Sequence, residues 1–543
     1  MHKNRCITYH VAQRIHGSLG DIFFDSFKIL KDMGYKEISL KLPPDYTEAQ
    51  LKRRIGKALN IRVFSYQMDS KSLDARKKDN IHWLVRVAVS SEELKGIPRA
   101  VIPSLEIPYQ KRKERVLVVG NGPAGFFAAY VLQKAGFQTT LIDRGAEAPK
   151  REAGIKRFER TGVFDPVGNY AFGEGGAGTF SDGKLTSRSK HISREKRFIL
   201  ESYIQAGAPE EIAYMAHPHI GSDRLKIIVQ RLREQYQKIG GKVYFETLLE
   251  DLRVENGGVV QAVTSMGSLD ADTLIIAPGH SSYETYRMLN KRGVSFRTKN
   301  FAIGSRVEHL QEVINLAQWG KKKLPGVKAA EYRLTYNFKG NLPVFTFCMC
   351  PGGTVVPATA YSHSNIVNGM SRYLRNEKFA NAACVAAVHP DRLLQKKTTP
   401  LEVLDWLEAM ERRFFDITGK YEAPYCSIKD FIEKKEPANR VETSYPLGLK
   451  PAALWEMLPA DVAVSIRGAL LSFSKKILGF ESGIIMGLES KTSSPIQAVR
   501  EPDGKCIGFT NLYIVGEGSG HSGGIISSAA DGIRIAMGVV EGR

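Results

Sequence analysis

The chain has 543 residues, of which 43% are hydrophobic and 25% are charged. This balance is typical of globular proteins and excludes a disordered tail, a collagen-like fibre and a small disulfide-stapled domain. Lys and Arg number 77 against 57 Asp and Glu, and the resulting net charge of +20 favours a polyanionic partner, a membrane surface or an anionic ligand. Residues 1–115 hold 23 Lys or Arg and 13 Asp or Glu, so about half of the excess is regional.

The six cysteines contain no CxxC pair, so the sequence predicts neither a disulfide framework nor a metal site. The first residues show no apolar region typical of a secretory signal. No apolar run approaches the 18 or so residues that a membrane-spanning helix needs. We therefore expect a cytoplasmic protein.

Residues 1–110 predict a small basic α/β module, for which a ferredoxin-like fold is one option. Thr47 and Gln50 form a capping-box pattern that starts a basic helix ending near residue 59. Strands are expected on either side of this helix, at 36–42, 61–66 and 81–89. Three prolines between residues 97 and 108 indicate a linker.

A βαβ unit begins after the linker. Residues 115–120 form a continuous apolar strand of the kind buried on both faces of a parallel sheet, followed by a helix over 126–135 and a strand over 139–143. Residues 145–192 read as a long irregular stretch. The later expected helices are 194–206, 222–238, 401–415, 460–477 and 525–540, and the later strands are 301–307, 344–349 and 512–515.

The pattern G-x-G-x-x-G occurs three times, and only its context gives it meaning. The first copy is Gly120-Asn-Gly122-Pro123-Ala124-Gly125, between the first strand and helix of the βαβ unit. Gly120 permits the tight turn, Gly122 the approach of a pyrophosphate, and Gly125 close helix packing. The N–H groups at the helix N-terminus favour binding of phosphates. Asp143, after the next strand, would accept hydrogen bonds from the ribose hydroxyls. This copy predicts a dinucleotide site; a ligand-free glycine turn is the alternative.

The second copy, at 173–178, is followed by no helical pattern. It indicates a backbone loop packed against a ligand, with a purely structural glycine loop as the alternative. The third copy, at 518–523, lies between a strand and the last helix, with only 20 residues left before Arg543. It cannot start an independent nucleotide-binding unit, but it presents a helix N-terminus to an electron-rich ring edge. A capping helix packed on the sheet is its other interpretation.

These positions predict a discontinuous domain whose sheet is closed by both halves of the chain. The fold class is α/β: a Rossmann-like domain, an inserted α+β substrate domain and the small N-terminal module. The expected boundaries are 1–110 for the module, 111–300 and 481–543 for the two parts of the Rossmann-like domain, and 301–480 for the substrate domain.

Residues 115–145 (RVLVVGNGPAGFFAAYVLQKAGFQTTLIDRG) resemble the FAD fingerprint of the glutathione-reductase-like superfamily of FAD-dependent oxidoreductases, in which Glu usually replaces Asp143. Residues 272–279 resemble the later strand of that superfamily, which ends in a glycine turn. Residues 512–524 resemble its C-terminal flavin motif, with Glu517 in place of the Asp that holds the ribityl chain. The resemblance implies a bound FAD, and we expect it to be non-covalent because no residue stands out as an attachment point.

More narrowly, the chain resembles a bacterial family of FAD-dependent dehydrogenases or FAD-binding proteins. The strings that carry this resemblance are SLDARKK (72–78), FGEGGAGTFSDGKL (172–185), HPHIGSD (217–223), FCMCPGG (347–353), VNGMS (367–371), ESKTSSPI (489–496) and GEGSGHSGGI (516–525). The resemblance supplies no substrate. The FAD contacts that we expect are Gly120, Gly122, Pro123, Ala124, Gly125, Asp143, Arg144, Gly176, Gly178, Thr179, Ser181, Lys184, Leu248, Ala277, Gly279, Gly516, Glu517, Gly523, Gly524 and Ile525.

Candidate catalytic residues are polar groups expected near the flavin ring, which itself carries the hydride. His521, in the C-terminal glycine motif, is a candidate proton donor, with a structural bond to the turn as an equal alternative. Arg306 is expected either to pair with Glu308 on the same strand face or to grip an anionic substrate while His309 handles a proton.

Cys348 and Cys350 are two residues apart on an expected strand, so both thiols would project to one side. A dithiol that relays electrons is one interpretation, and a simple tight turn before Pro351 is the other.

The preferred function is that of an FAD-dependent oxidoreductase acting on an unidentified, anionic or unsaturated small molecule. Only one dinucleotide fold is visible, so NAD(P)H as electron donor would bind transiently in the substrate cleft. The basic N-terminal module motivates an alternative, a flavoprotein that acts on or binds RNA, although no RNA-binding signature is present. A third possibility is a non-catalytic FAD sensor.

Overall fold

The computed structural model describes residues 34–96, 103–437 and 441–542. The chain divides into two compact units. The first contains the described residues up to Lys71 together with those from Trp83 to residue 96, and the second contains Ser72–His82 and everything described from residue 103 onward.

The N-terminal unit is a three-stranded sheet with one helix. Its strands β1 (Gly34–Leu42), β2 (Ser65–Asp74) and β3 (His82–Ser91) lie in the order β1-β3-β2. Helix α2 (Glu48–Leu59) begins with the predicted capping box: Thr47 Oγ1 accepts from Gln50 N, and the Gln50 side chain accepts from Thr47 N. The strand predicted at 61–66 begins only at Ser65. A ferredoxin-like fold would also need residues 1–33, which lie outside the described residues.

A five-stranded parallel sheet forms the centre of the second unit. Its order is β22-β10-β4-β5-β6, and every neighbouring pair is parallel. The strands are β4 (Arg115–Val119), β5 (Gln138–Ile142), β6 (Lys242–Tyr244), β10 (Thr273–Ile276) and β22 (Leu512–Ile514). Because β22 comes from the C-terminal end, the prediction of a discontinuous Rossmann-like domain is confirmed.

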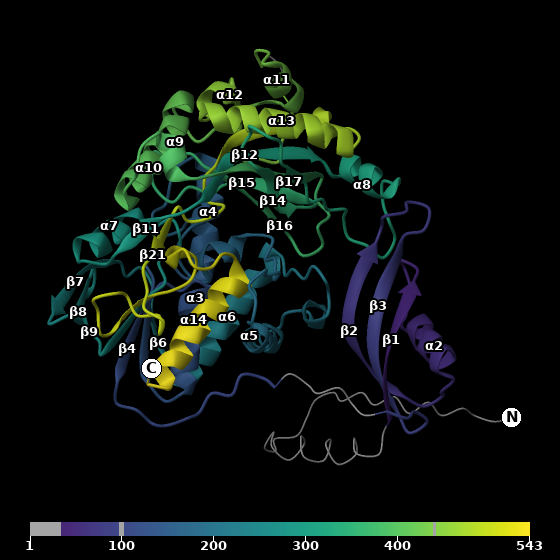
Figure 1. Cartoon of the computed structure of the whole chain (residues 1–543), viewed down its shortest axis with the longest axis horizontal. Helices are drawn as coiled ribbons and strands as arrows, with labels where there is room; N and C mark the ends of the chain where they lie inside the picture. Colours follow the sequence, from purple (N-terminus) through teal and green to yellow (C-terminus); the bar gives the residue numbers. More distant parts are fainter. Residues whose placement is uncertain (1–33, 97–102, 438–440, 543) are drawn as a thin grey trace. The chain divides into compact units, whose positions relative to one another are not determined.

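Helices α3 (Pro123–Lys134) and α14 (Ile525–Val540) pack lengthwise against each other beside this sheet (Figure 1). A Cβ on Gly532 of α14 would lie 2.1 Å from the carbonyl oxygen of Ala124, so glycine is needed for this close approach. Helices α5 (Ser193–Gln205) and α6 (Ser222–Lys238) share the same hydrophobic core and match the predicted helices closely.

Helix α4 (Ala148–Thr161) corrects the expectation of an irregular stretch over 145–192. Gly162, with φ of 69°, ends the helix in the left-handed conformation. The apolar periodicity of the sequence did not predict this helix, because two positions on its buried face are Arg151 and Gly154. Only Ile155 and Phe158 supply large apolar side chains to that face.

The inserted domain is built on a seven-stranded mixed sheet in the order β13-β14-β17-β12-β20-β18-β19. Its strands are β12 (Phe301–Leu310), β13 (Thr335–Tyr336), β14 (Val344–Cys350), β17 (Phe379–Val388), β18 (Ala423–Ser427), β19 (Leu449–Pro451) and β20 (Ile484–Glu489). Helix α13 (Ala460–Lys476) covers one face of this sheet, as Figure 1 shows. Helix α10 (Pro400–Thr418) and the hairpin of β15 (Gly353–Pro357) and β16 (Val367–Ser371) complete the domain.

The inserted domain extends beyond the expected boundary at residue 480, because it includes strand β20. It pairs with β12 and β18 inside the mixed sheet, so the chain returns to the parallel sheet only after Glu489. The six residues of β20 are all buried, which leaves no polar alternation to identify the strand. Among the described residues, no helix combines the length and the apolar character needed to cross a bilayer.

Candidate functional site

The carboxylate of Asp143 joins three turns at the end of β5. Its Oδ2 accepts from Asn121 N at 2.6 Å, and its Oδ1 accepts from Gly145 N at 2.8 Å and from Gly173 N at 2.9 Å. Burial raises the pKa of Asp143, while these N–H groups and nearby Arg151 act in the opposite direction. Three of about four acceptor positions are thus occupied, and about one remains for the predicted ribose contact.

Arg151 of α4 holds the second glycine loop in place, a role that the sequence analysis did not assign to it. Its fully buried guanidinium donates to the carbonyl oxygens of Asn169, Tyr170, Glu174 and Gly176 at 2.6 to 3.2 Å. Burial lowers the pKa of Arg151 to about 10, so it remains charged at neutral pH. A cation in the middle of a buried helix face was the available signal.

Four glycine-rich segments meet at the carboxyl ends of β4, β10 and β22. We call them the glycine cradle; they are residues 120–125, 173–178, 277–279 and 516–525. A Cβ on Gly176 would lie 3.0 Å from Gly122 Cα, which brings the first two segments into contact. A Cβ on Gly518 would lie 2.6 Å from the carbonyl oxygen of Gly279, and one on Gly178 would lie 3.2 Å from Ile525 Cγ1. Segments separated by up to about 400 residues therefore form one surface.

The glycine cradle has open positions where side chains are missing. A Cβ added to Gly122 would meet only Gly176 Cα, at 3.8 Å, and one added to Gly279 or Gly524 would meet nothing within 4 Å. Gly122 is also the N-cap of α3, whose first N–H groups have no capping side chain. Backbone N–H groups at a helix N-terminus with open space above them suit a pyrophosphate. The residues present therefore fit a dinucleotide cofactor.

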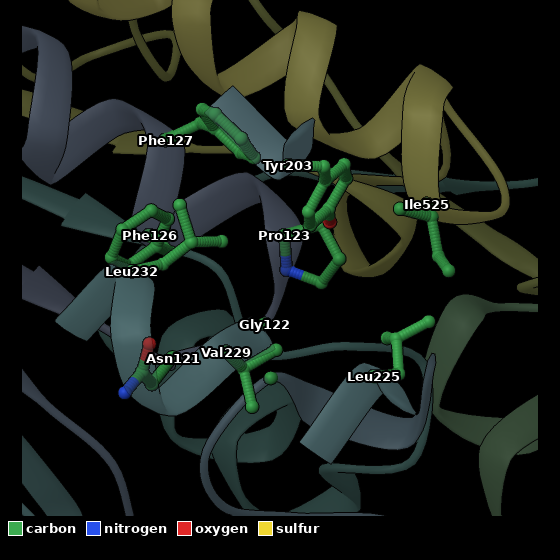
Figure 2. Close-up of a pocket in the computed structure, with 11 residues that line it drawn as sticks. Asn121, Gly122, Pro123, Phe126, Phe127, Tyr203, Leu225, Val229, Leu232 and Ile525 are labelled. Atoms are coloured by element: carbon green, nitrogen blue, oxygen red, sulfur yellow. The ribbon is translucent and has the colours of Figure 1, made fainter. Parts of the chain in front are cut away.

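A small apolar cavity lies behind the first turn of the cradle (Figure 2). Its volume is about 20 Å³, enough for about one water molecule and far too small for a flavin ring. In Figure 2, Phe126, Phe127 and Leu232 lie on one side of it, and Leu225 and Ile525 on the other. This cavity therefore cannot hold the flavin ring.

Two other residues expected to contact FAD, both in or next to the second loop, use their hydroxyl groups for hydrogen bonds within that loop. Thr179 Oγ1 donates to the carbonyl of Glu174 at 2.9 Å, and Ser181 Oγ donates to that of Gly178 at 2.7 Å. Arg144 lies over the Phe172 ring, 4.1 Å from its centre, and pairs with Glu284. Leu248 lies outside the cradle, between β6 and β7 (Leu249–Glu255), where its N–H donates to Ser265. The FAD contacts of these residues stay predictions.

Asp182 and Lys184 connect the cradle to the inserted domain. Asp182 accepts from Arg375 Nε and Nη2 at 3.1 and 2.6 Å and from Ser371 Oγ at 2.6 Å. Although burial alone would raise it, Lys184 and Arg375 hold the pKa of Asp182 well below its usual range. Lys184 Nζ lies 2.9 Å from Asp182 and also donates to the Met349 carbonyl, so its ammonium faces β14.

Arg306 is fully buried and pairs with Glu489 rather than with Glu308. Its Nε donates to Glu489 Oε2 at 3.0 Å, and its two Nη atoms donate to the side-chain oxygens of Asn381 and Asn368 at 2.7 and 2.9 Å. The expected grip on an anionic substrate is not available to a guanidinium without exposed surface. Glu308 instead accepts from Thr443 and Ser444.

His309 lies on the opposite face of β12 from Arg306, so the expected pair does not form one site. Its Nε2 lies 2.8 Å from the Phe480 carbonyl, and its ring packs between Phe480 and Tyr332. Burial lowers the pKa of His309 to about 4. His309 is therefore a neutral core residue.

Cys348 and Cys350 do not project to the same side of β14. A β-bulge between Phe347 and Cys350 breaks the alternation, and Cys348 has a φ of 42°. Cys348 is exposed and Cys350 is buried, with its thiol 3.3 Å from the Cys348 carbonyl oxygen. Both thiols are free, so the geometry provides no paired dithiol.

Both ring nitrogens of His521 are engaged by neighbouring groups. Nε2 lies 2.9 Å from the Ala498 carbonyl, and Nδ1 lies 3.3 Å from Gln497 Nε2. The ring also lines an open polar cleft of about 800 Å³ that includes Arg500 and Asp531. These contacts agree with the structural interpretation of His521, in which its ring bonds to neighbouring groups of the turn.

His280 was missed by the sequence analysis, yet it directly follows Gly279 in the cradle. Its Nδ1 lies 3.5 Å from Glu517 Oε1, and its Nε2 is buried without a partner. It also lies near Glu489, whose ionised form it favours. A histidine next to a predicted glycine turn was the available signal.

Comparison with known proteins agrees with this geometry. Residues 113–278 match an FAD binding domain, residues 300–492 match the C-terminal domain of FAD-dependent proteins, and residues 35–90 match a domain of unknown function. An uncharacterised protein of Clostridium beijerinckii is 36% identical over 526 residues, which cover 93% of this chain and 98% of that protein. The chain belongs to the same family as this clostridial protein. It is a flavoprotein, and FAD is its cofactor.

Solved structures resemble the chain more distantly. A geranylgeranyl bacteriochlorophyll reductase-like protein of Thermoplasma acidophilum is 15% identical, with 80% of this chain and 79% of that chain covered and a TM-score of 0.37. Glycine oxidase of Bacillus cereus is 12% identical, with 79% and 95% covered and a TM-score of 0.32. A likeness of this degree identifies no shared reaction.

Replacement of Gly122 by Ala should weaken FAD binding at least tenfold without destabilising the protein. The added methyl meets no protein atom closer than 3.8 Å, but it occupies the side from which the pyrophosphate approaches. FAD affinity can be measured by quenching of flavin fluorescence, and the thermal midpoint of the FAD-free protein serves as the stability check. Gly538→Ala, on α14 with open surroundings, is the matched control. Wild-type affinity in Gly122→Ala would place the cofactor elsewhere.

Stability should fall as the pH is lowered from about 6.5 to about 4. Burial lowers the pKa of His309, and also of His219, to about 4, so over this range the unfolded chain binds protons that the folded protein does not. One such proton changes the unfolding free energy by about 1.4 kcal/mol per pH unit. His309→Gln should remove about one proton from the slope measured by urea unfolding.

The control for this experiment is the exposed His363, replaced by Asn, which tolerates its φ of 57°. Equal slopes in the wild type and His309→Gln would show that His309 is not held neutral by the fold.

Proposed function

We propose that this flavoprotein is an oxidoreductase that passes hydride between non-covalently bound FAD and a small molecule. The observation that carries the proposal is the position of the glycine cradle. It follows β4, β10 and β22 directly, and in open α/β sheets ligands bind outside the carboxyl ends of the strands. When bound, FAD supplies the two-electron chemistry.

The chain's own residues bind and position the reactants. The first N–H groups of α3 and α14 face the cradle, and the partial positive charge of each helix terminus favours electron-rich groups of the cofactor. Asp143 and Arg151 hold the first two glycine segments in place. The substrate would enter between the cradle and the mixed sheet, because Lys184 already bridges these two surfaces.

The substrate's side of the proposed site carries a thiol and an ammonium group. Cys348 lies in the bulge of β14, where burial of its thiol raises the pKa to about 12 and the ammonium of nearby Lys184 only partly opposes this rise. Arg306, the residue first expected to bind an anion, is covered by Gly369 of β16, where a Cβ would lie 2.3 Å from its Nη1. An anionic substrate would therefore meet Lys184 before it met Arg306.

NAD(P)H is the proposed electron donor, bound transiently at the same opening. The support is that, in the described part of the chain, the parallel sheet offers a single strand-turn-helix of the dinucleotide type, which FAD would occupy. An RNA partner rests on the charge of residues 1–115 alone, and no feature of the N-terminal unit adds to it.

Anaerobic mixing of the purified protein with NADH or NADPH tests this proposal. We expect a yellow protein whose flavin is released by acid, and whose visible absorption is bleached by at least one of the two nucleotides much faster than free FAD is. Gly122→Ala, which retains little FAD, is the control for reaction in solution. Tightly bound FAD that neither nucleotide reduces faster than free FAD would favour the non-catalytic sensor.

A further inference from the structure

His280 occupies the edge of the glycine cradle that faces the inserted domain. It follows β10 by four residues, and its neighbour Gly279 contacts the turn at Gly518. On the other side, the charge of His280 acts on Glu489 of β20, which belongs to the mixed sheet. The residue therefore stands between the FAD segments and the substrate domain.

The imidazole is mostly enclosed, with 12% of its side chain exposed. Nδ1 points toward Glu517 Oε1, whereas Nε2 is buried and has no hydrogen-bond partner in the protein. A buried polar atom without a partner is destabilising, so such an atom points to a ligand that completes its hydrogen bonding. His309 also has one unpartnered nitrogen, but aromatic rings surround it.

The surroundings of His280 are open on the cofactor side. A Cβ on Gly279 would meet nothing within 4 Å, and one on Gly523 would meet only Glu517 Oε1, at 3.9 Å. Space for a ligand therefore lies next to both members of the His280–Glu517 pair.

Charged groups from three segments lie around the ring. Glu517 of the turn η4 (Glu517–Ser519) faces Nδ1 at 3.5 Å, and Glu489 of β20 lies beyond, already paired with Arg306. The ammonium of Lys299 lies near Glu517 and donates to the Gly520 carbonyl at 2.7 Å. Because Nδ1 faces the Glu517 carboxylate, Nε2 is the nitrogen that remains for a ligand.

We propose that His280 is a cofactor-binding residue whose Nε2 hydrogen bonds to FAD, with Glu517 as the positioning residue that fixes the ring. The inference rests on the proposed function, because it requires FAD in the glycine cradle. It adds a contact from a side chain that neither the glycine motifs nor the family resemblance assigns.

The test is the visible flavin spectrum of the FAD-loaded protein, together with FAD affinity. In His280→Gln, we expect a shifted flavin spectrum and FAD to bind about tenfold more weakly, with an unchanged thermal midpoint of the FAD-free protein. In Glu517→Gln, the spectrum should shift in the same direction, because the ring loses the carboxylate that faces its Nδ1.

His363→Asn is the matched control, since this exposed histidine lies outside the glycine cradle, and its spectrum should follow the wild type. A His280→Gln variant with wild-type FAD affinity and a wild-type spectrum would overturn the inference. Failure of the wild type itself to bind FAD would instead overturn the proposed function.

Discussion

Three backbone N–H groups from three different turns converge on the carboxylate of Asp143, and the geometry of the cofactor site depends on this convergence. Hydrogen bonds to a charged acceptor contribute about 1.5–3 kcal/mol each, and here they also fix the relative positions of the turns. Arg151 acts as the counterpart, because its guanidinium donates to carbonyl oxygens of the same loop that donates its Gly173 N–H to Asp143. These hydrogen bonds therefore fix the conformation of the glycine-rich turns, which have few side chains of their own to hold them.

A second carboxylate extends this arrangement to the inserted domain. Asp182 follows the second glycine segment and accepts a bidentate pair from Arg375, a hydroxyl from Ser371 and the ammonium of Lys184. Removing one partner of such a buried pair typically costs 3–5 kcal/mol, since a charge is left uncompensated. The surface on which a substrate would lie is thus held by the same stretch of chain that forms the cradle.

Much of the fold followed from local patterns, because helices such as α6 and α14 and strands such as β4 combine clear periodicity with clear ends. The first glycine turn was equally readable, since its spacing has a direct physical meaning. Helix α4 was missed because its buried face carries Arg151, and β20 was missed because it is buried on both faces.

The candidate catalytic residues were harder to predict for a different reason. The partner of Arg306 is 183 residues away on β20, while the nearer Glu308 turns to Thr443 and Ser444. The bulge in β14 separated Cys348 from Cys350, and neither their spacing nor the following Pro351 indicates it. His280 could be recognised only once the turn after β10 had been placed beside Glu517.

The central claim is that the four segments of the glycine cradle form one FAD site. Hydrogen–deuterium exchange of the FAD-depleted protein, with and without added FAD, tests it most directly. The account predicts slower exchange on FAD addition in all four segments, 120–125, 173–178, 277–279 and 516–525. Protection confined to residues 120–125, with unchanged exchange at 516–525, would contradict it.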